Sequence, residues 1–170
     1  IMADLLLEGS VDKKRRHEFT VSLRRQLERL TWLTETLLKL SQLDAGSVVF
    51  RPGLVSIREL IDKAASPMLI PMELKEQTLG IRAQGSVYCD LNWTAEALTN
   101  VVKNCMEHTP AGSTITISGL ENPLFAEIKI RDNGPGIDRA DFAKIFNRFY
   151  KGKNASSQGY GIGLAMAKTI

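Results

Sequence analysis

Apolar residues recur at helical spacing through the first quarter of the chain, and they predict one long helix over residues 14–44. The stripe advances by three or four residues at each step, and Gln26 is its only polar member. Its members are Phe19, Leu23, Gln26, Leu30, Leu33, Leu37 and Leu40. Leu27, Leu38 and Leu43 widen it beyond the seam of a two-stranded coiled coil, which favours a four-helix bundle.

Residues 1–8 have the pattern of the end of an earlier helix, and Gly9-Ser10 is typical of a turn. Residues 1–46 therefore predict a partial helical hairpin. A hairpin cannot bury so wide an apolar stripe by itself. We expect a partner, most simply a second copy of the chain, in a dimeric four-helix bundle.

Beyond Ala45-Gly46-Ser47, short strands and helices segregate instead of alternating, which predicts an α+β, two-layer sandwich domain over residues 47–170. The expected elements are a strand at 48–50, a turn at Pro52-Gly53, a helix capped by Ser56 and broken at Pro67 and Pro71, strands at 78–83 and 87–89, a helix at 94–107 capped by Asn92, strands at 114–118 and 127–131, a helix at 138–149 and a last helix from Gly161. Glu121-Asn122-Pro123 separates two alternating strands, so these predict an antiparallel hairpin.

Composition narrows the class of protein. The content of 44% hydrophobic and 24% charged residues is that of a soluble globular protein, and a net charge of +3 does not indicate a nucleic-acid partner. Cys89 and Cys105 lack metal-ligand spacing and indicate a reducing compartment. No apolar run approaches the roughly 18 residues that span a bilayer. Because the chain starts in the middle of one pattern and stops inside another, we expect it to be a fragment.

Four polar residues recur at every fourth position of the largely apolar segment 92–108. Glu96, Asn100, Asn104 and His108 therefore lie along one face of the expected helix. Buried amides are costly when unpaired, and a hydrated magnesium ion with phosphate oxygens would give Asn104 suitable partners. The alternative is that these are ordinary amides on a helix surface.

Asp132 stands at the end of an alternating strand and is followed by Asn133-Gly134-Pro135-Gly136-Ile137. An ionised carboxylate only accepts hydrogen bonds, so it suits the exocyclic amino group of adenine and would repel the oxygen that guanine carries there. Gly134 and Gly136 would let the backbone approach the base. The same residues are also a strong turn sequence without any ligand.

The segment Gly159-Tyr160-Gly161-Ile162-Gly163-Leu164 leads into the last expected helix. Such a loop offers backbone amides and the positive end of a helix to phosphates, although glycine-rich loops also serve as linkers. Arg148 and Lys151 precede it and could reach phosphates. Their neighbours Phe146 and Phe149 are expected to lie in the core.

In this order, the segments resemble the sequence boxes of bacterial sensor histidine kinases. The catalytic ATP-binding domain of that family belongs to a superfamily with type II topoisomerases, a heat-shock chaperone and mismatch-repair ATPases. The resemblance covers nearly all 170 residues. Residues 100–104 are similar to the N box, 132–136 to the first glycine box, 146–149 to the F box, 159–163 to the second glycine box, and 30–46 to the second helix of the dimerisation and phosphotransfer domain.

The resemblance implies a kinase core that binds ATP with Mg²⁺ and transfers the γ-phosphoryl group to a histidine, for relay to an aspartate of a response regulator. Asn100 and Asn104 would be the catalytic residues, Asn104 would bind the metal, and residues 138–159 would form a lid over ATP. The nucleotide would be held by Asn100, Asn104, His108, Asp132, Gly134, Gly136, Ile137, Arg148, Lys151, Gly159, Gly161, Gly163 and Leu164. The family also implies a homodimer and the cytoplasmic domain of a membrane sensor.

Two other functions stay open. ATP-hydrolysing relatives generally have a glutamate at position 100 that activates water, whereas Asn100 is a poor general base near neutral pH. This difference favours transfer to a protein nucleophile over hydrolysis. The remaining alternative is a module that holds ATP to control dimer geometry and transfers nothing.

The chain departs from the family pattern at both ends. The phosphoacceptor box, His-Glu followed by a threonine or asparagine and a proline, is absent, and in family register it would precede Ile1. His17 is followed by Phe19 rather than by Thr-Pro, and we expect it to be a solvated helix residue. The chain also stops before the strand that should follow the last helix, so the catalytic domain is expected to be truncated.

A further departure concerns the phosphate-binding residues. Glu107 stands where many family members have a lysine near the phosphates. A carboxylate about 4 Å from a phosphate charge would repel it by roughly 4 kcal/mol at an effective dielectric constant of 20. We therefore expect Glu107 to point away, which leaves phosphate contacts to Lys103, Arg148 or Lys151.

Overall fold

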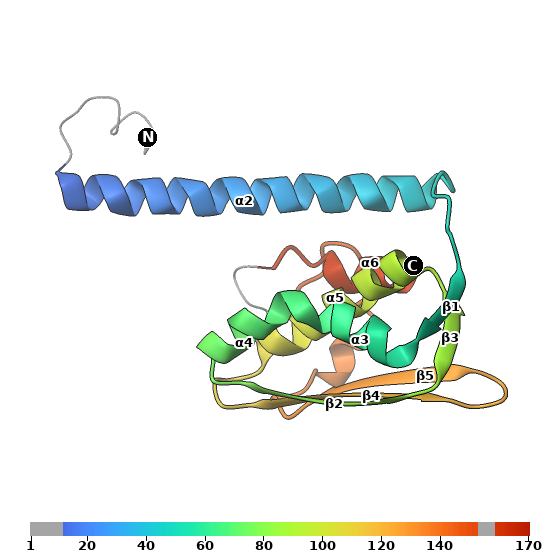
Figure 1. Cartoon of the computed structure of the whole chain (residues 1–170). Helices are drawn as coiled ribbons and strands as arrows, with labels where there is room; N and C mark the ends of the chain where they lie inside the picture. Colours follow the sequence, from blue (N-terminus) through green and yellow to red (C-terminus); the bar gives the residue numbers. More distant parts are fainter. Residues whose placement is uncertain (1–11, 153–158) are drawn as a thin grey trace. The chain divides into compact units, whose positions relative to one another are not determined.

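The computed structural model describes residues 12–152 and 159–170, and the chain divides into two compact units at residues 46 and 47. The described part of the first unit is the single helix α2 (Lys13–Asp44) with its caps (Figure 1). The Asp12 side chain caps α2 by accepting a 2.8 Å hydrogen bond from the Arg15 N–H. The predicted long helix is confirmed, whereas the earlier helix predicted at residues 1–8 lies outside the described residues.

The second unit contains the remaining elements. They are β1 (Gly53–Ser56), α3 (Ile57–Ala65), the 3-10 helix η1 (Ser66–Met68), α4 (Leu69–Leu74), β2 (Thr78–Gln84), β3 (Ser86–Cys89), α5 (Leu91–His108), β4 (Thr114–Glu121), β5 (Ala126–Asp132), the 3-10 helix η2 (Arg139–Asp141) and α6 (Gly163–Thr169). Ser56 caps α3 as predicted, and Pro67 lies in η1, where the predicted helix is divided. Pro71 lies in the first turn of α4, so the break expected there is wrong.

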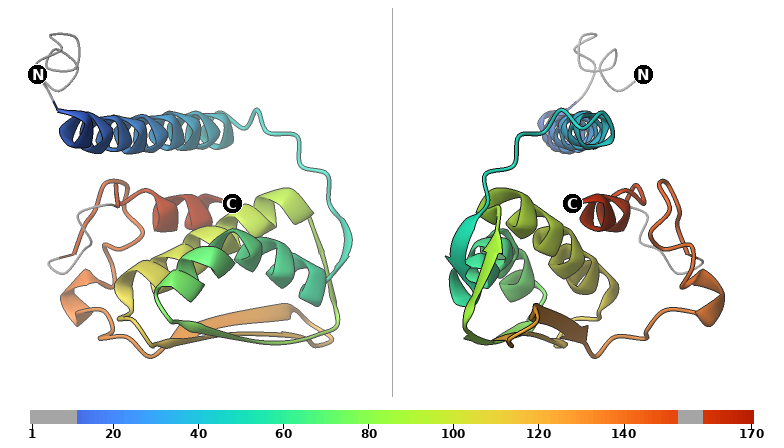
Figure 2. Two further views of the ribbon diagram at one scale, coloured as in Figure 1. Left: turned by 60° about the vertical axis from the view of Figure 1, so that its left-hand side comes forward. Right: turned by 90° about the vertical axis from the view of Figure 1, so that its right-hand side faces the viewer.

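Strands β2, β4 and β5 form one sheet, in which β4 lies in the middle, parallel to β2 and antiparallel to β5. Strands β1 and β3 form a separate antiparallel pair. Helices α3, α4 and α5 lie on one side of the three-stranded sheet (Figures 1 and 2). The predicted α+β class, the hairpin of β4 and β5, and the strands at 78–83 and 87–89 are therefore confirmed.

The core of the second unit lies between the helices and the sheet. Ile57 and Ile61 of α3, Val102 of α5, and Ile115 and Ile117 of β4 are all at most 1% exposed. Burying each such side chain contributes roughly 1.5–3 kcal/mol. Alternate residues of β4 face this core, as the alternating sequence predicts. Helix α5 is therefore held firmly over the middle of the sheet.

Two details of the predicted secondary structure are wrong near the start of α5. The strand expected at 48–50 lies instead at Gly53–Ser56, where it pairs with β3, so Gly53 belongs to the strand and not to the expected turn. Phe50 packs edge-on against the Trp93 ring, with 5.9 Å between the ring centroids. The cap of α5 is Asp90 rather than Asn92, whose side-chain oxygen accepts a 2.8 Å hydrogen bond from Lys63. The contacts of Phe50 with Trp93 and of Lys63 with Asn92 join residues distant in sequence, so local pattern could not reveal them.

The helix predicted at 138–149 is also wrong, because only the three-residue η2 forms there. Phe146 and Phe149, expected in the core, are 41% and 62% exposed. Without an apolar surface to pack against, a short amphipathic helix is marginal. The last helix begins at Gly163 rather than at Gly161, whose φ of +68° is incompatible with an α-helix.

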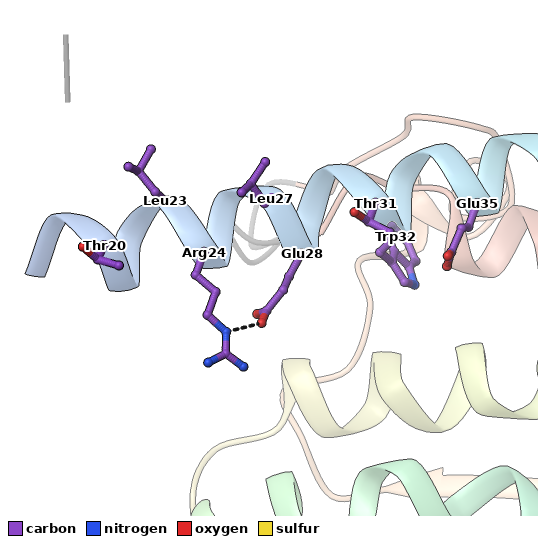
Figure 3. A pocket seen from close by; sticks show the side chains of 8 residues that line it. All are labelled: Thr20, Leu23, Arg24, Leu27, Glu28, Thr31, Trp32 and Glu35. Carbon is purple, nitrogen blue, oxygen red and sulfur yellow. Dashed lines mark hydrogen bonds and ion pairs between the residues drawn. The ribbon is translucent and has the colours of Figure 1, made fainter. Parts of the chain in front are cut away.

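Helix α2 keeps much of its apolar stripe in contact with solvent. Leu27, Leu30 and Leu38 are each more than half exposed. Figure 3 shows an open pocket whose lining residues all belong to α2, with Leu27 on the side of the helix opposite the 2.8 Å ion pair of Arg24 with Glu28. No helix within residues 12–152 and 159–170 is long and apolar enough to cross a membrane.

Candidate functional site

Helix α5 carries the asparagines singled out by the sequence, and both of its ends are fixed by side chains. At the N-terminal end, one Asp90 oxygen accepts hydrogen bonds from the N–H groups of Asn92 (2.9 Å) and Trp93 (3.1 Å). The other accepts from the Arg51 N–H at 2.7 Å. These hydrogen bonds, that from Arg51 foremost, lower the pKa of Asp90. Asp90 thus joins the segment before β1 to the start of α5.

At the C-terminal end of α5, two side chains donate to backbone oxygens that the helix leaves without partners. The Lys75 ammonium donates to the Met106 oxygen at 2.6 Å and to the Thr109 oxygen at 3.0 Å. The buried Gln77 amide donates to the same two oxygens, at 3.2 and 3.1 Å, and to the Thr109 hydroxyl at 2.8 Å. Lys75 and Gln77 could not be predicted from the sequence, because nothing local marks them as partners of a helix about 30 residues away.

Asn100 lies inside the fold. It is 9% exposed. Its side-chain amide N–H donates a 2.9 Å hydrogen bond to the backbone oxygen of Glu96, one helical turn earlier. Its Oδ1 is 3.0 Å from the position that a Cβ on Gly163 would occupy. The absence of a side chain at Gly163 therefore lets the start of α6 pack directly on Asn100.

Asn104 is one helical turn further along α5 and is half-buried. Among the described residues, no hydrogen bond is recorded for its side chain, in contrast to Asn100. An amide oxygen in this position can take a hard cation such as Mg²⁺. No cluster of three or more His, Cys, Asp or Glu side chains suited to a metal occurs in the described part of the chain. A metal would thus need phosphate or water oxygens to complete its ligands.

Asp132 ends β5 on the side of the sheet that faces α5, because it follows Ile128 and Ile130 at alternate positions. Its Oδ1 accepts a 2.9 Å hydrogen bond from the Gly134 N–H. A Cβ on Gly134 would stand 2.8 Å from Thr109 Cγ2, so the turn packs against the end of α5. Gly136 has φ +75°, a conformation that side chains disfavour.

Cys105 of α5 lies near the same carboxylate, which the sequence did not predict. The thiol is 8% exposed. Burial, followed by the nearby Asp132 carboxylate, raises the pKa of the thiol to about 12. Its place next to Asn104 was the one signal that the sequence offered.

The glycine segment is anchored where it meets residues 149 and 150. The Phe149 N–H donates to the Gly161 oxygen at 2.8 Å, and a Cβ on Gly161 would collide with the Tyr150 oxygen. The Tyr150 hydroxyl donates to Asp141 at 2.6 Å, and this hydrogen bond raises the pKa of Tyr150. Gly159, which precedes Gly161, and Leu164, which follows it, are both half-buried.

Other candidate residues lie at the protein surface. The side chains of His108, Ile137, Arg148 and Lys151 are exposed. Glu107 pairs with Lys103 one turn earlier on α5, with 3.9 Å between the charged atoms. Helix α5 therefore brings Asn100 together with Gly163, and Cys105 and Thr109 together with Asp132 and Gly134.

Comparison with known proteins identifies this arrangement. Residues 89–170, from the end of β3 to the end of the chain, match the family described as histidine kinase-, DNA gyrase B-, and HSP90-like ATPase. This part of the chain belongs to that family. The asparagines of α5, Asp132 and both glycine segments lie within the matched residues.

The relatives of this ATPase domain include sensor kinases. The sensor protein kinase PmrB of Pseudomonas aeruginosa is 31% identical over 165 residues, which are 95% of this chain and 34% of that protein. The swarming motility regulation sensor protein RssA of Serratia marcescens is 29% identical over 177 residues, with 100% of this chain and 37% of that protein covered. The chain thus spans about a third of the length of these curated relatives.

Solved structures agree with the assignment. The histidine kinase AdeS of Acinetobacter baumannii superposes with a TM-score of 0.76 at 22% identity, over 99% of this chain and 78% of that chain, which supports the fold. The mycobacterial sensor histidine kinase MprB gives a TM-score of 0.59 at 27% identity, over 69% of this chain and 76% of that chain. The ATPase domain here therefore has the fold of histidine kinase catalytic domains.

Proposed function

We propose that this chain is the kinase core of a two-component sensor histidine kinase, which binds ATP with Mg²⁺ and transfers the γ-phosphoryl group to a histidine. The observation that carries the proposal is the convergence on α5. Asn100 meets Gly163 of the second glycine segment, while Cys105 and Thr109 lie near Asp132 and Gly134 of the first. The family match and the sensor-kinase relatives support this use of the site.

In this proposal Asp132 recognises the adenine base of ATP. Its carboxylate accepts hydrogen bonds only, and the Gly134 N–H occupies just part of its acceptor capacity. The remaining lone pairs suit the amino group of adenine. Gly134 and Gly136 border the base, as do His108 and Ile137, which are exposed and available for contact.

The phosphates would lie along α5 toward the second glycine segment. Asn104 would give its amide oxygen to Mg²⁺, which when bound neutralises phosphate charge. Backbone N–H groups of residues 159–164 and the exposed cations Arg148 and Lys151 would meet phosphate oxygens. Asn100 would act by placing this glycine segment, because its own amide is engaged within the protein.

The acceptor is proposed to be neither histidine of this chain. The chain has two, and one of them, His108, belongs to the proposed nucleotide site. The other, His17, is exposed in the second turn of α2. The exposed leucines of α2 support dimerisation through this helix. The sensor-kinase relatives support a role in signalling. Relay to a response regulator, and a place as the cytoplasmic domain of a membrane sensor, are part of the proposal.

Calorimetry with Mg·ATP and Mg·GTP tests the nucleotide site. We expect the wild-type chain to prefer ATP and Asp132→Asn to lose at least tenfold in ATP affinity, because the amide adds a donor facing the amino group. Arg131→Gln, an exposed neighbour on the opposite face of β5, is the matched control. Equal affinity of the wild type for ATP and GTP would refute the assignment of Asp132 to adenine.

Incubation with γ-labelled ATP tests transfer, using this chain joined to the preceding part of its protein. We expect acid-labile, base-stable label that is lost in Asn104→Asp and retained in His17→Ala. Labelling that disappears in His17→Ala would place the acceptor in α2 and contradict the proposal. ATP binding without any label would favour the alternative of a regulatory nucleotide-binding module.

A further inference from the structure

The Asp141 carboxylate joins η2 to residues about ten positions further along the chain. Its Oδ1 accepts a 2.6 Å hydrogen bond from the hydroxyl of Tyr150, which is half-buried. Its Oδ2 lies 2.8 Å from the position that a Cβ on Gly152 would occupy, so Gly152 leaves room for the carboxylate. The backbone oxygen of Asp141 accepts hydrogen bonds from the N–H groups of Lys144 and Ile145, at 2.8 and 2.9 Å. Asp141 therefore holds both ends of the segment that leads to Tyr150.

The backbone at Phe149 needs such support. Its φ is +63°, in the left-handed region that is unfavourable for a bulky residue, and a conformation of this kind persists only where its surroundings hold it. On one side, the Phe149 N–H donates to the Gly161 oxygen at 2.8 Å. On the other side, Tyr150 is held by its N–H, which donates to the Asn147 oxygen at 3.2 Å, and by its hydroxyl on Asp141.

The position of Gly161 depends on this backbone. Besides accepting the hydrogen bond from Phe149, Gly161 packs so closely on the Tyr150 backbone that a Cβ would collide with the Tyr150 oxygen. If the Tyr150 hydroxyl lost its partner, Phe149 could relax toward a common φ. Its N–H would then turn away from the Gly161 oxygen.

We propose that Tyr150 and Asp141 are positioning residues for phosphate binding: their hydrogen bond keeps residues 149 and 150 in the conformation that holds Gly161, and so keeps the backbone N–H groups of residues 159–164 in place for the phosphates of ATP. This role rests on the proposed nucleotide-binding function. The Tyr150 and Asp141 side chains act through Gly161. Holding the loop before the ligand arrives strengthens binding, because less conformational freedom is lost on association.

The test compares the affinity of the whole chain for Mg·ATP with its affinity for adenosine, which has the base and the ribose but no phosphate. Calorimetry measures both. A variant that only destabilises the fold lowers the two affinities alike, whereas a variant that misplaces the phosphate loop lowers their ratio. We expect Tyr150→Phe, which removes only the hydroxyl, and Asp141→Ala to lower this ratio roughly three- to tenfold. Asp141→Asn keeps an oxygen acceptor and should retain most of it.

Two further variants sharpen the test. Tyr88→Phe is the matched control, because Tyr88 lies on β3 and is 70% exposed, and its ratio should equal that of the wild type. The double variant Tyr150→Phe/Asp141→Ala lacks the same single hydrogen bond as each of its parents, so its ratio should be no lower than theirs. If Asp141→Ala does not fold, as judged by circular dichroism, Tyr150→Phe and Asp141→Asn still test the role.

The outcomes separate this inference from the function on which it rests. A wild-type ratio in the folded Tyr150→Phe variant overturns the positioning role and leaves the phosphate site in place. A double variant in which the two effects multiply shows that the residues act separately and also overturns it. A wild type that binds Mg·ATP no more tightly than adenosine overturns both the role and the phosphate site. A ratio lowered in Tyr150→Phe and retained in Asp141→Asn supports the role.

Discussion

The side-chain oxygen of Asn100 lies 3.0 Å from the point where a Cβ on Gly163 would stand. This distance is shorter than an ordinary contact between a carbon and an oxygen, so a side chain at position 163 would require Asn100 to shift by a few tenths of an ångström. The second glycine segment is therefore placed by Asn100 at its helical end. In the middle of the segment, the Gly161 oxygen accepts a hydrogen bond from the Phe149 N–H, and Gly161 packs closely against the Tyr150 backbone.

Gly163→Ala should force Asn100 and α6 apart. We expect a loss of about 1–3 kcal/mol in the free energy of unfolding, as for other overpacked sites, and weaker binding of Mg·ATP. Urea denaturation and calorimetry measure the two effects. Gly53→Ala is the control, because no atom lies within 4 Å of a Cβ there. A Gly163→Ala variant with wild-type stability and affinity would show that the contact is unimportant.

The stability of the protein should fall at high pH on account of Cys105. The folded state holds the pKa of this thiol at about 12, above its ordinary 9.0, so between these values the unfolded chain releases a proton that the folded chain keeps. The contribution is complete below pH 9.0 and is lost toward pH 12. Above pH 9.0, the stability difference between wild type and Cys105→Ser should shrink by up to about 1.4 kcal/mol per pH unit. Urea denaturation at a series of pH values measures it, and a difference that does not change with pH would contradict it.

Gln77→Leu should loosen the C-terminal end of α5. The side chain is 7% exposed and donates to Thr109 and Pro110, while its own oxygen has no partner among the described residues. Leucine removes the donor to the Thr109 hydroxyl and to the Pro110 oxygen, which costs about 1–3 kcal/mol, while Lys75 still holds the Met106 and Thr109 backbone oxygens. Thermal unfolding should show a lower Tm, whereas Gln84→Leu, at the exposed end of β2, should not. Equal Tm values for the two variants would contradict the prediction.

Glu107→Gln should strengthen the binding of Mg·ATP. The Glu107 carboxylate lies 3.9 Å from the Lys103 ammonium. Replacing this carboxylate by an amide leaves more of the Lys103 positive charge for the phosphates. It also removes a negative charge near the proposed path of the phosphates. We expect a gain of roughly two- to fivefold in affinity, larger at low salt. Glu59→Gln, exposed on α3, controls for net charge. An unchanged affinity would place Glu107 outside the reach of the phosphates.

Most of the regular structure could be predicted from local pattern. Helix α2, the alternating strands β4 and β5, and the interruption at Pro67 all follow from spacing and from backbone restrictions that act within a few residues. The helix expected at 138–149 failed because its aromatic residues found too little apolar surface, and no local pattern reports whether such a surface exists.

For the site, the sequence alone determined which chemical groups are present and in which order: two amides one turn apart, a carboxylate at a strand end and two glycine segments. It could not show that Cys105 lies near Asp132, that Asn100 faces Gly163, or that Lys75 and Gln77 hold the end of α5. Those pairs join residues about 27 to 63 positions apart. Only the packing of α5 on the sheet brings them together, because burial in a shared core decides which distant side chains meet.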